Sequence, residues 1–177
     1  DILRDIELYR RLGNQAFVWQ VSKDEAADTR TVRICAKDRP GLFSKIAGTF
    51  TLNNLNILYA QIYTWRNGTA LDIFTLRPPL DKIFEDEHWT RAERNLMAAL
   101  SDQLDLREQL QKKINQFESI KPKVSKRPHK VMVDNQSSSF FTIIEVFTYD
   151  FPGLLFAITD ALYRQDLDIW VAKISTK

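Results

Sequence analysis

Two short motifs carry the residue types that a small charged ligand would need. They are Asp38–Leu42 (DRPGL) and Asp150–Leu154 (DFPGL). In each motif the aspartate offers a partner for an ammonium group. The glycine turn would leave backbone amides free at the start of a helix, where a carboxylate binds well. Because a free amino acid has both groups, the two motifs predict amino-acid binding.

The motifs belong to a longer repeat. At a shift of 112 residues, Val32–Thr64 aligns without gaps on Ile144–Thr176, with ten identities. Each copy opens with an alternating apolar strand, continues through Pro-Gly into apolar residues at helical spacing, and ends in a polar break before a β-branched run. The breaks are Asn53-Asn54 and Gln165-Asp166. We therefore expect the same strand–helix–strand path twice, with equivalent glycine turns.

Only the first copy continues beyond this path. Asn67-Gly68 predicts a hairpin in which both residues have positive φ. An amphipathic helix is expected from Glu87 to Phe117, and Lys130–Asp134 (KVMVD) is expected to close the sheet. The order strand, helix, strand, strand, helix, strand is that of a ferredoxin-like unit. The predicted fold class is α+β, with two ferredoxin-like (βαββαβ) domains in tandem and the second truncated after strand–helix–strand.

These patterns predict three segments: 1–28 as an N-terminal helix and strand, 29–136 as the first domain, and 137–177 as the N-terminal half of the second. The strand expected at 16–21 either forms a hairpin with 31–36 or joins the sheet edge. Half a unit leaves apolar faces and strand edges open, so something else is expected to complete it: a neighbouring chain, the first domain or a tail. The chain is also expected to be part of something longer, or to have a missing half that is disordered or cut off.

The two motifs, followed by Asn56-Ile57 and Asp168-Ile169 at the start of later strands, resemble ACT domains. More narrowly, the close-set repeats and the helix between them resemble the C-terminal tandem ACT region of the bifunctional uridylyltransferase/uridylyl-removing enzymes that act on the nitrogen-regulatory protein PII. Phe151 stands where the first copy has Arg39, so the two sites need not be equivalent.

This resemblance implies that nucleotidyltransferase and HD-type phosphohydrolase domains precede the segment, and that the parent enzyme uses Mg²⁺ and UTP. It also implies that the tandem module senses glutamine and controls nitrogen-assimilation signalling, with PII as a partner through the parent enzyme. ACT–ACT pairing within or between chains is expected as well.

The predicted ligand-binding residues come from both copies. Asn56 would read a side-chain amide, and Asp168 takes its place in the second copy. A purely structural interpretation stays open for each residue, since aspartate before a helix is often a cap and Pro-Gly is often a tight turn. The set is Asp38, Pro40, Gly41, Leu42, Phe43, Asn56, Ile57, Asp150, Pro152, Gly153, Leu154, Leu155, Asp168 and Ile169.

No catalytic or metal site is predicted in this segment, and no cofactor is expected in it. Cys35 lies within a strand and is expected to be a buried apolar residue. His88 and His129 lack a carboxylate cluster for a metal. Asp72 lies within a strand and is expected to be exposed. The basic stretch 121–130 is expected to be a solvated linker, and nucleotide-binding and Gly-x-Ser-x-Gly motifs are absent.

Composition limits the classes of partner. The chain has 44% hydrophobic and 27% charged residues, as soluble globular proteins do, and its net charge of +2 argues against nucleic-acid and membrane binding. No apolar run approaches the roughly 20 residues of a membrane span. A single cysteine is consistent with a cytoplasmic protein.

Three alternatives to the sensor remain. The first is a structural ACT module whose sheets join edge to edge without a ligand. The second is the ACT region of another amino-acid-metabolism or stringent-response enzyme. The third is a nucleic-acid binder of the RNA-recognition kind, which would need a Gly-aromatic motif on the sheet face and a basic face; the motif is absent and the net charge does not provide the face.

Overall fold

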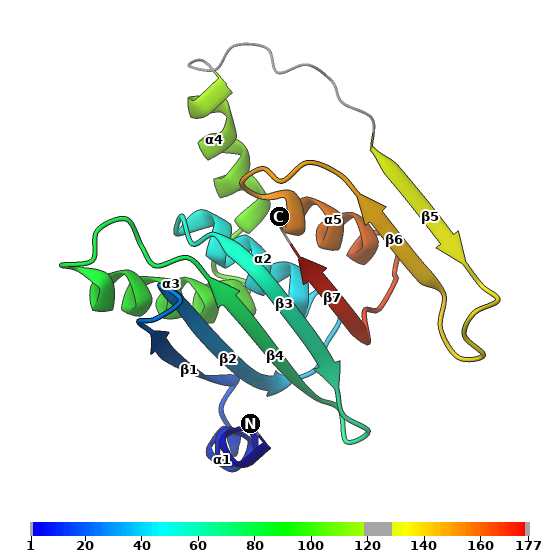
Figure 1. The fold of residues 1–177 in the computed structure, drawn as a ribbon, viewed down its shortest axis with the longest axis horizontal. Helices are drawn as coiled ribbons and strands as arrows, with labels where there is room; N and C mark the ends of the chain where they lie inside the picture. Colours follow the sequence, from blue (N-terminus) through cyan, green and yellow to red (C-terminus); the bar gives the residue numbers. More distant parts are fainter. Residues whose placement is uncertain (1, 119–128, 176–177) are drawn as a thin grey trace.

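Five strands form one antiparallel sheet in the spatial order β1-β2-β4-β3-β7 (Figure 1). The computed structural model describes residues 2–118 and 129–175 of the chain. A separate hairpin joins β5 to β6. The strands are β1 (Phe17–Asp24), β2 (Thr29–Lys37), β3 (Ile57–Thr64), β4 (Thr69–Leu76), β5 (Lys130–Asp134), β6 (Ile143–Phe147) and β7 (Val171–Ser175).

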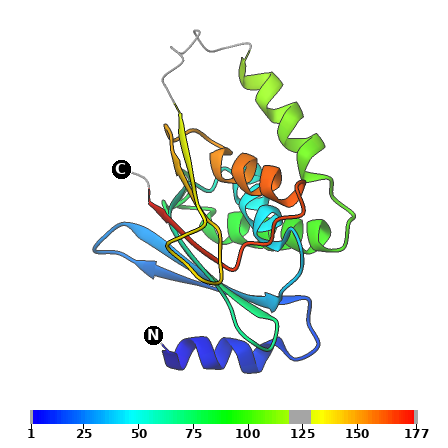
Figure 2. The ribbon, with the colours of Figure 1, turned by 90° about the vertical axis from the view of Figure 1, so that its right-hand side faces the viewer.

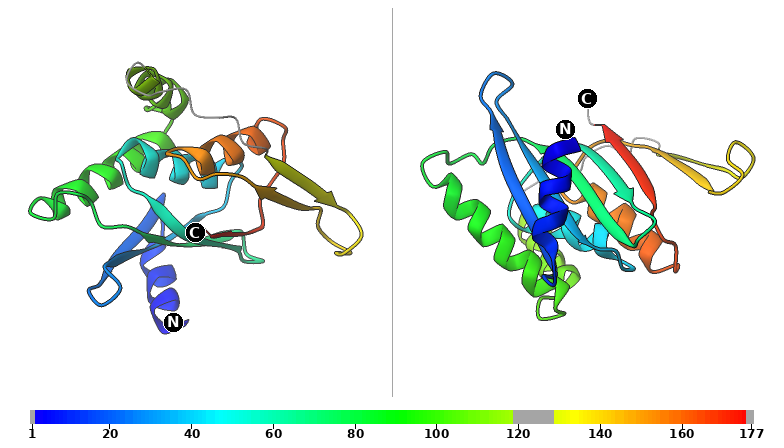
Figure 3. Two further views of the ribbon diagram at one scale, coloured as in Figure 1. Left: turned by 45° about the horizontal axis from the view of Figure 1, so that its top comes forward. Right: turned by 90° about the horizontal axis from the view of Figure 1, so that it is seen from below.

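Helices cover both faces of this sheet. Figures 2 and 3 show α1 on one face and α2, α3 and α5 on the other. The main core lies between the sheet and α2 and α3, while a smaller cluster that includes the fully buried Cys35 lies beneath α1. The helices are α1 (Ile2–Leu12), α2 (Leu42–Leu52), α3 (Glu85–Leu100), α4 (Leu106–Glu118) and α5 (Leu154–Tyr163).

The two repeats follow the same path, as predicted. Gly41 and Gly153 both stand immediately before a helix in the left-handed conformation, with φ of 79° and 92°. Asn54 and Asp166, which are 112 residues apart, lie just after the ends of the two helices and have φ of 58° and 55°. The fold is thus α+β with two ferredoxin-like units: the first unit contains β2, α2, β3, β4 and α3, and the second contains β6, α5 and β7.

The strand predicted to close the first unit belongs elsewhere, so that prediction is wrong. β5 pairs with β6, whereas β1 forms a hairpin with β2 and holds that edge of the sheet. Val18 lies opposite Cys35 and Lys130 opposite Phe147, and both residues of the second pair are 112 positions after those of the first. β5 is therefore the counterpart of β1. A short hairpin loop costs less closure entropy than the long connection through two helices. The boundaries 29–136 and 137–177 stay predictions.

The helix predicted from Glu87 to Phe117 is instead two helices. α3 ends at Leu100, and Asp102 has a positive φ of 57°. α4 then begins after Asp105, whose Oδ1 accepts a hydrogen bond from the Glu108 amide at 3.0 Å. Serine and aspartate side chains compete for backbone hydrogen bonds, so this short polar stretch outweighs the apolar periodicity around it.

The hairpin predicted at Asn67-Gly68 is present, but its turn differs from the expectation. Gly68 has a φ of 73°, whereas Asn67 is not among the described residues with positive φ. The Gly68 amide donates to the Trp65 carbonyl at 2.9 Å, and the Trp65 amide donates to the Thr69 carbonyl at 2.8 Å. A longer loop with glycine in the left-handed position replaces the two-residue turn.

β7 extends the sheet of the first unit by pairing with β3. The first unit thus completes one edge of the second unit. This was one of the alternatives that the sequence left open. Gln61 lies opposite Lys173, its own repeat equivalent. This reciprocity is that of an isologous interface, with a local two-fold axis between the two residues. The flanking pairs are Ala60 with Ile174 and Ile62 with Ala172.

No helix within the described parts of the chain is both long and apolar enough to cross a membrane.

Candidate ligand site between the two units

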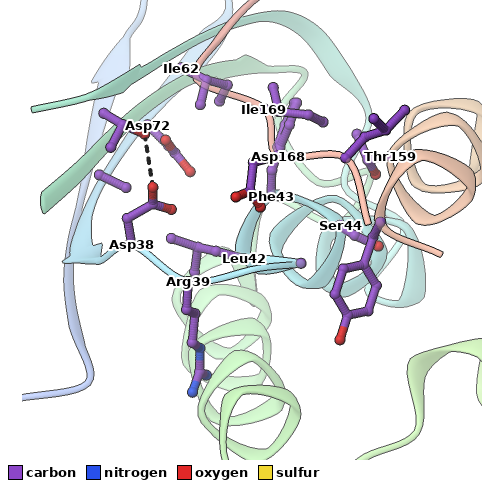
Figure 4. A pocket seen from close by; sticks show the side chains of 15 residues that line it. Asp38, Arg39, Leu42, Phe43, Ser44, Ile62, Asp72, Thr159, Asp168 and Ile169 are labelled. Atoms are coloured by element: carbon purple, nitrogen blue, oxygen red, sulfur yellow. Dashed lines mark hydrogen bonds between the residues drawn. The ribbon is translucent and has the colours of Figure 1, made fainter. Parts of the chain in front are cut away.

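A pocket lies at the junction of the two units (Figure 4). The first unit contributes the turn and helix start at 38–44 together with residues of β3 and β4. The second unit contributes residues of α5 and the segment 167–169 that leads into β7. Because neither unit forms the pocket alone, a ligand bound there would contact both.

The structure brings six of the predicted site residues together across the two copies: Asp38, Gly41, Leu42, Phe43, Asp168 and Ile169 line the pocket. Asp168 of the second copy therefore lies in the pocket beside the first turn. From the sequence, Asn56 of the first copy was expected in this place. Asn56 is exposed, and Ile57 packs against the main core.

The remaining predicted residues do not line this pocket. Pro40 is exposed beside it, and the second turn lies elsewhere at the junction of the units, where Gly153 approaches Thr51. This set comprises Pro40, Asn56, Ile57, Asp150, Pro152, Gly153, Leu154 and Leu155.

Asp38 and Arg39 diverge after the end of β2. Asp38 is exposed, and its Oδ2 accepts a hydrogen bond from the Thr64 hydroxyl at 3.2 Å, so its carboxylate lies beside β3 (Figure 4). Arg39 points away from the pocket, and its Nη2 donates to the carbonyl of Leu100 at 2.5 Å, at the C-terminus of α3. A cation there complements the helix dipole. Arg39 therefore supports α3 and leaves the pocket acidic.

Asp72 is the pocket residue that the sequence placed wrongly. It was expected to be exposed, but its side chain is 1% exposed and lies on the face of β4 that also carries the core residues Ala70 and Phe74. Among the described residues, its Oδ1 has no hydrogen-bond partner. Burial, reinforced by the charge of Asp38, raises the pKa of the Asp72 carboxyl well above its ordinary value.

The glycine turn does not leave the open space that the sequence suggested. A Cβ on Gly41 would lie 3.1 Å from the ring of Tyr163, so a side chain of the second unit already fills the space on that side. The equivalent contact joins Gly153 to Thr51, where a Cβ added to the glycine would lie 3.3 Å from Cγ2 of the threonine. Both glycines are therefore needed for the close approach of the two units.

The start of α2 still offers anion-binding groups. Leu42 donates its amide to the Arg39 carbonyl at 3.1 Å, whereas the amides of Phe43 and Ser44 meet no backbone carbonyl among the described residues. Free amides in a first helical turn carry partial positive charge. A carboxylate at this position would lie close to the Asp38 side of the pocket.

Helix α4 holds α5, and hence one wall of the pocket, against the first unit. Arg107 on α4 donates through Nη2 and Nε to both oxygens of Asp160, at 2.6 and 3.3 Å. Lys113 on α4 donates through Nζ to the carbonyls of Thr51 and Leu52 at the end of α2, at 2.9 and 2.8 Å. α4 therefore bridges the central helices of both units.

The pocket has acidic groups at its mouth and its floor. Asp38 and Asp168 are exposed, Asp72 is buried, and none of the three forms an ion pair with a described residue. Within the described residues, no group of three His, Cys, Asp or Glu side chains is placed to hold a metal ion. The arrangement instead suits a single ammonium group, with amides nearby for a carboxylate.

Comparison with known proteins agrees with this architecture. A family model described as ACT domain matches residues 30–79, which include the first turn and the strands β3 and β4. An ACT domain is thus found at residues 30–79. No solved structure matches it.

The curated relatives that this chain resembles share one name. A bifunctional uridylyltransferase/uridylyl-removing enzyme of Rhodospirillum rubrum is 35% identical over 164 residues, covering 89% of this chain and 17% of the relative. Its namesakes in Gluconobacter oxydans and Azospirillum brasilense are 36% and 37% identical, covering 86% and 82% of this chain and 16% of each relative. The ACT units described here thus span about a sixth of the length of these relatives.

Several lining residues were not predicted from the sequence, for different reasons. The burial of Asp72 could have been predicted from the sequence, because Asp72 alternates in phase with the buried core residues Ala70 and Phe74. No sequence pattern indicated Thr159 and Tyr163, since they line the pocket only because α5 docks beside α2. That docking depends on the pairing of the two ACT units.

Proposed function

We propose that this chain is the amino-acid-sensing ACT module of a bifunctional uridylyltransferase/uridylyl-removing enzyme acting on PII, and that glutamine binds in the pocket between its two units. The observation that carries the proposal is an acidic pocket beside free amides of a helix N-terminus, with its basic lining residue, Arg39, turned away. The choice of enzyme is supported by the names of the relatives. The cytoplasmic location, PII as partner, and Mg²⁺ and UTP in the parent enzyme belong to this proposal.

Each polar group of glutamine has a partner of suitable chemistry. The ammonium group binds beside Asp38, and the carboxylate binds the amides of Phe43 and Ser44. The side-chain amide donates to Asp168, which comes from the other unit. Since these groups belong to both units, glutamine favours the docked arrangement over any looser one, and the parent enzyme senses that shift in population.

A structural role without a ligand is the competing function, and one observation favours it. β3 and β7 already join the two units through main-chain pairing with reciprocal register. Such an edge-to-edge junction needs no ligand to form.

Calorimetry of this chain, and of the full-length enzyme that contains it, distinguishes the two functions. Glutamine is expected to bind both proteins, and Asp38→Asn is expected to weaken binding about 10-fold or more through loss of a charge-assisted hydrogen bond. Asp150→Asn is the matched control, because Asp150 is the exposed repeat equivalent of Asp38 and lies outside the pocket lining. If none of the twenty amino acids binds either protein, the structural function replaces the sensor.

A further inference from the structure

A carboxyl group buried in the middle of the sheet is an unusual feature of the first ACT unit. Asp72 stands on β4, the central strand, opposite Ile34 on one side and Ile62 on the other. Its side chain is 1% exposed, and its Oδ1 lacks a hydrogen-bond partner among the described residues. Burying a polar group without a partner destabilises a protein, so an apolar residue at this position would favour the ligand-free fold.

The surroundings of Asp72 show what is missing. The pocket opens over its side chain, and the basic residue in the lining, Arg39, turns away to α3. Among the described residues, no cation contributes to the environment of the Asp72 carboxyl, and the neighbouring charge that does contribute is the negative one of Asp38. An ionised Asp72 would therefore find no positive partner among the described residues at the floor of the pocket.

We propose that the ammonium group of the ligand binds between Asp72 and Asp38, and that Asp72 makes this pocket specific for a protonated primary amine. The inference rests on the proposed function and deepens it by naming the residue that selects the ligand class. Asp38 at the mouth attracts the amine, and Asp72 at the floor fixes its position. A neutral or acylated nitrogen would leave the Asp72 carboxyl without its counter-ion.

This arrangement couples binding to a proton. Without the ligand, burial and the charge of Asp38 raise the pKa of the Asp72 carboxyl, which favours its neutral form. When an ammonium group arrives already protonated, the Asp72 carboxyl gives its proton to solvent and forms an ion pair as a carboxylate. The other titratable or charged groups around the pocket are Asp38, Arg39, Tyr163 and Asp168. Cys35 lies on the other face of the adjacent strand, and the charge of Asp72 contributes to raising the pKa of its thiol.

Titration calorimetry at pH 7 in phosphate and in Tris buffer, whose ionisation enthalpies differ, tests this proposal. Wild type is expected to release protons when glutamine binds, as linkage requires for a carboxyl that ionises on binding. Asp72→Asn is expected to release none and to bind about 10- to 100-fold more weakly. N-acetylglutamine, which has no ammonium group, is expected to bind wild type poorly.

Two controls separate the role of Asp72 from a purely structural one. Asp72→Asn is expected to unfold at about the same temperature as wild type, because it exchanges one buried neutral polar group for another of the same shape. Asp38→Asn is expected to weaken binding while the proton release persists. If glutamine binds wild type without proton release, or binds Asp72→Asn equally well, the role of Asp72 is refuted while the sensor stands. If no amino acid binds wild type, both proposals are refuted.

Discussion

Gly41→Val is expected to lower the free energy of unfolding by about 3 kcal/mol and to abolish glutamine binding. Gly41 has a φ of 79°, a conformation that a β-branched residue adopts only with strain. Its new Cβ would also lie 3.1 Å from the ring of Tyr163, and the two methyl groups would push α5 away from α2. Chemical denaturation and calorimetry measure the two effects.

Gly68→Val is the matched control for this substitution. Gly68 has a similar φ of 73°, but nothing lies within 4 Å of a Cβ added there. This variant is expected to suffer the backbone strain alone, about 1–2 kcal/mol, and to keep the affinity for glutamine. Equal destabilisation by the two variants would show that Tyr163 does not press on the turn.

Glu85→Ala is expected to destabilise the first ACT unit by about 3–5 kcal/mol, because it leaves the buried Arg30 guanidinium without its counter-ion. Arg30 donates through Nε and Nη2 to both oxygens of Glu85, at 2.6 and 2.9 Å. The indole of Trp89 adds a third hydrogen bond to Glu85 at 3.0 Å. The neighbouring variant Asp86→Asn is expected to change little, since the Asp86 side chain is 94% exposed.

The same ion pair sets a pH dependence. The hydrogen bonds from Arg30 lower the pKa of Glu85 to about 2 in the folded protein. The stabilisation is therefore fully present above the ordinary glutamate pKa of about 4.3 and is lost as the pH falls from there toward 2. Unfolding measured between pH 7 and pH 2 is expected to show this loss in wild type and its absence in Glu85→Gln. A parallel decline in both proteins would contradict the assignment.

Most of the fold was predictable from the sequence because the turn and helix residues of the repeat specify the same local backbone in both copies. Positive φ at Gly41 and Gly153 follows from the residue type, and both helices begin at those turns. The pairing partner of Lys130–Asp134 did not follow from the sequence. A strand that lies between two units of this fold can pair with the sheet of either unit, and here it pairs with β6. Local pattern alone does not decide between two edges that are both open.

The candidate site was predictable only in part, for a related reason. Asp38 and Asp168 were each recognised within their own copy, but the pocket joins one copy's turn to the other's strand. The two units pair around the local two-fold axis near Gln61 and Lys173, and this pairing brings the strand of one copy beside the turn of the other. The prediction for Asp72 was wrong because a carboxylate in a strand is usually exposed, and only its phase with Phe74 indicated otherwise.

A titration of the ¹⁵N-labelled chain with glutamine, followed by amide chemical shifts, tests most directly whether the ligand binds between the two ACT units. The shifts are expected to concentrate at the amides of Gly41, Phe43, Ser44, Asp168 and Ile169, which line the pocket. The amides of Gly68 and of the second turn, at Gly153, are expected to stay unchanged. Saturable binding that shifts the Gly153 turn and leaves Gly41 and Asp168 unmoved would contradict this location of the site.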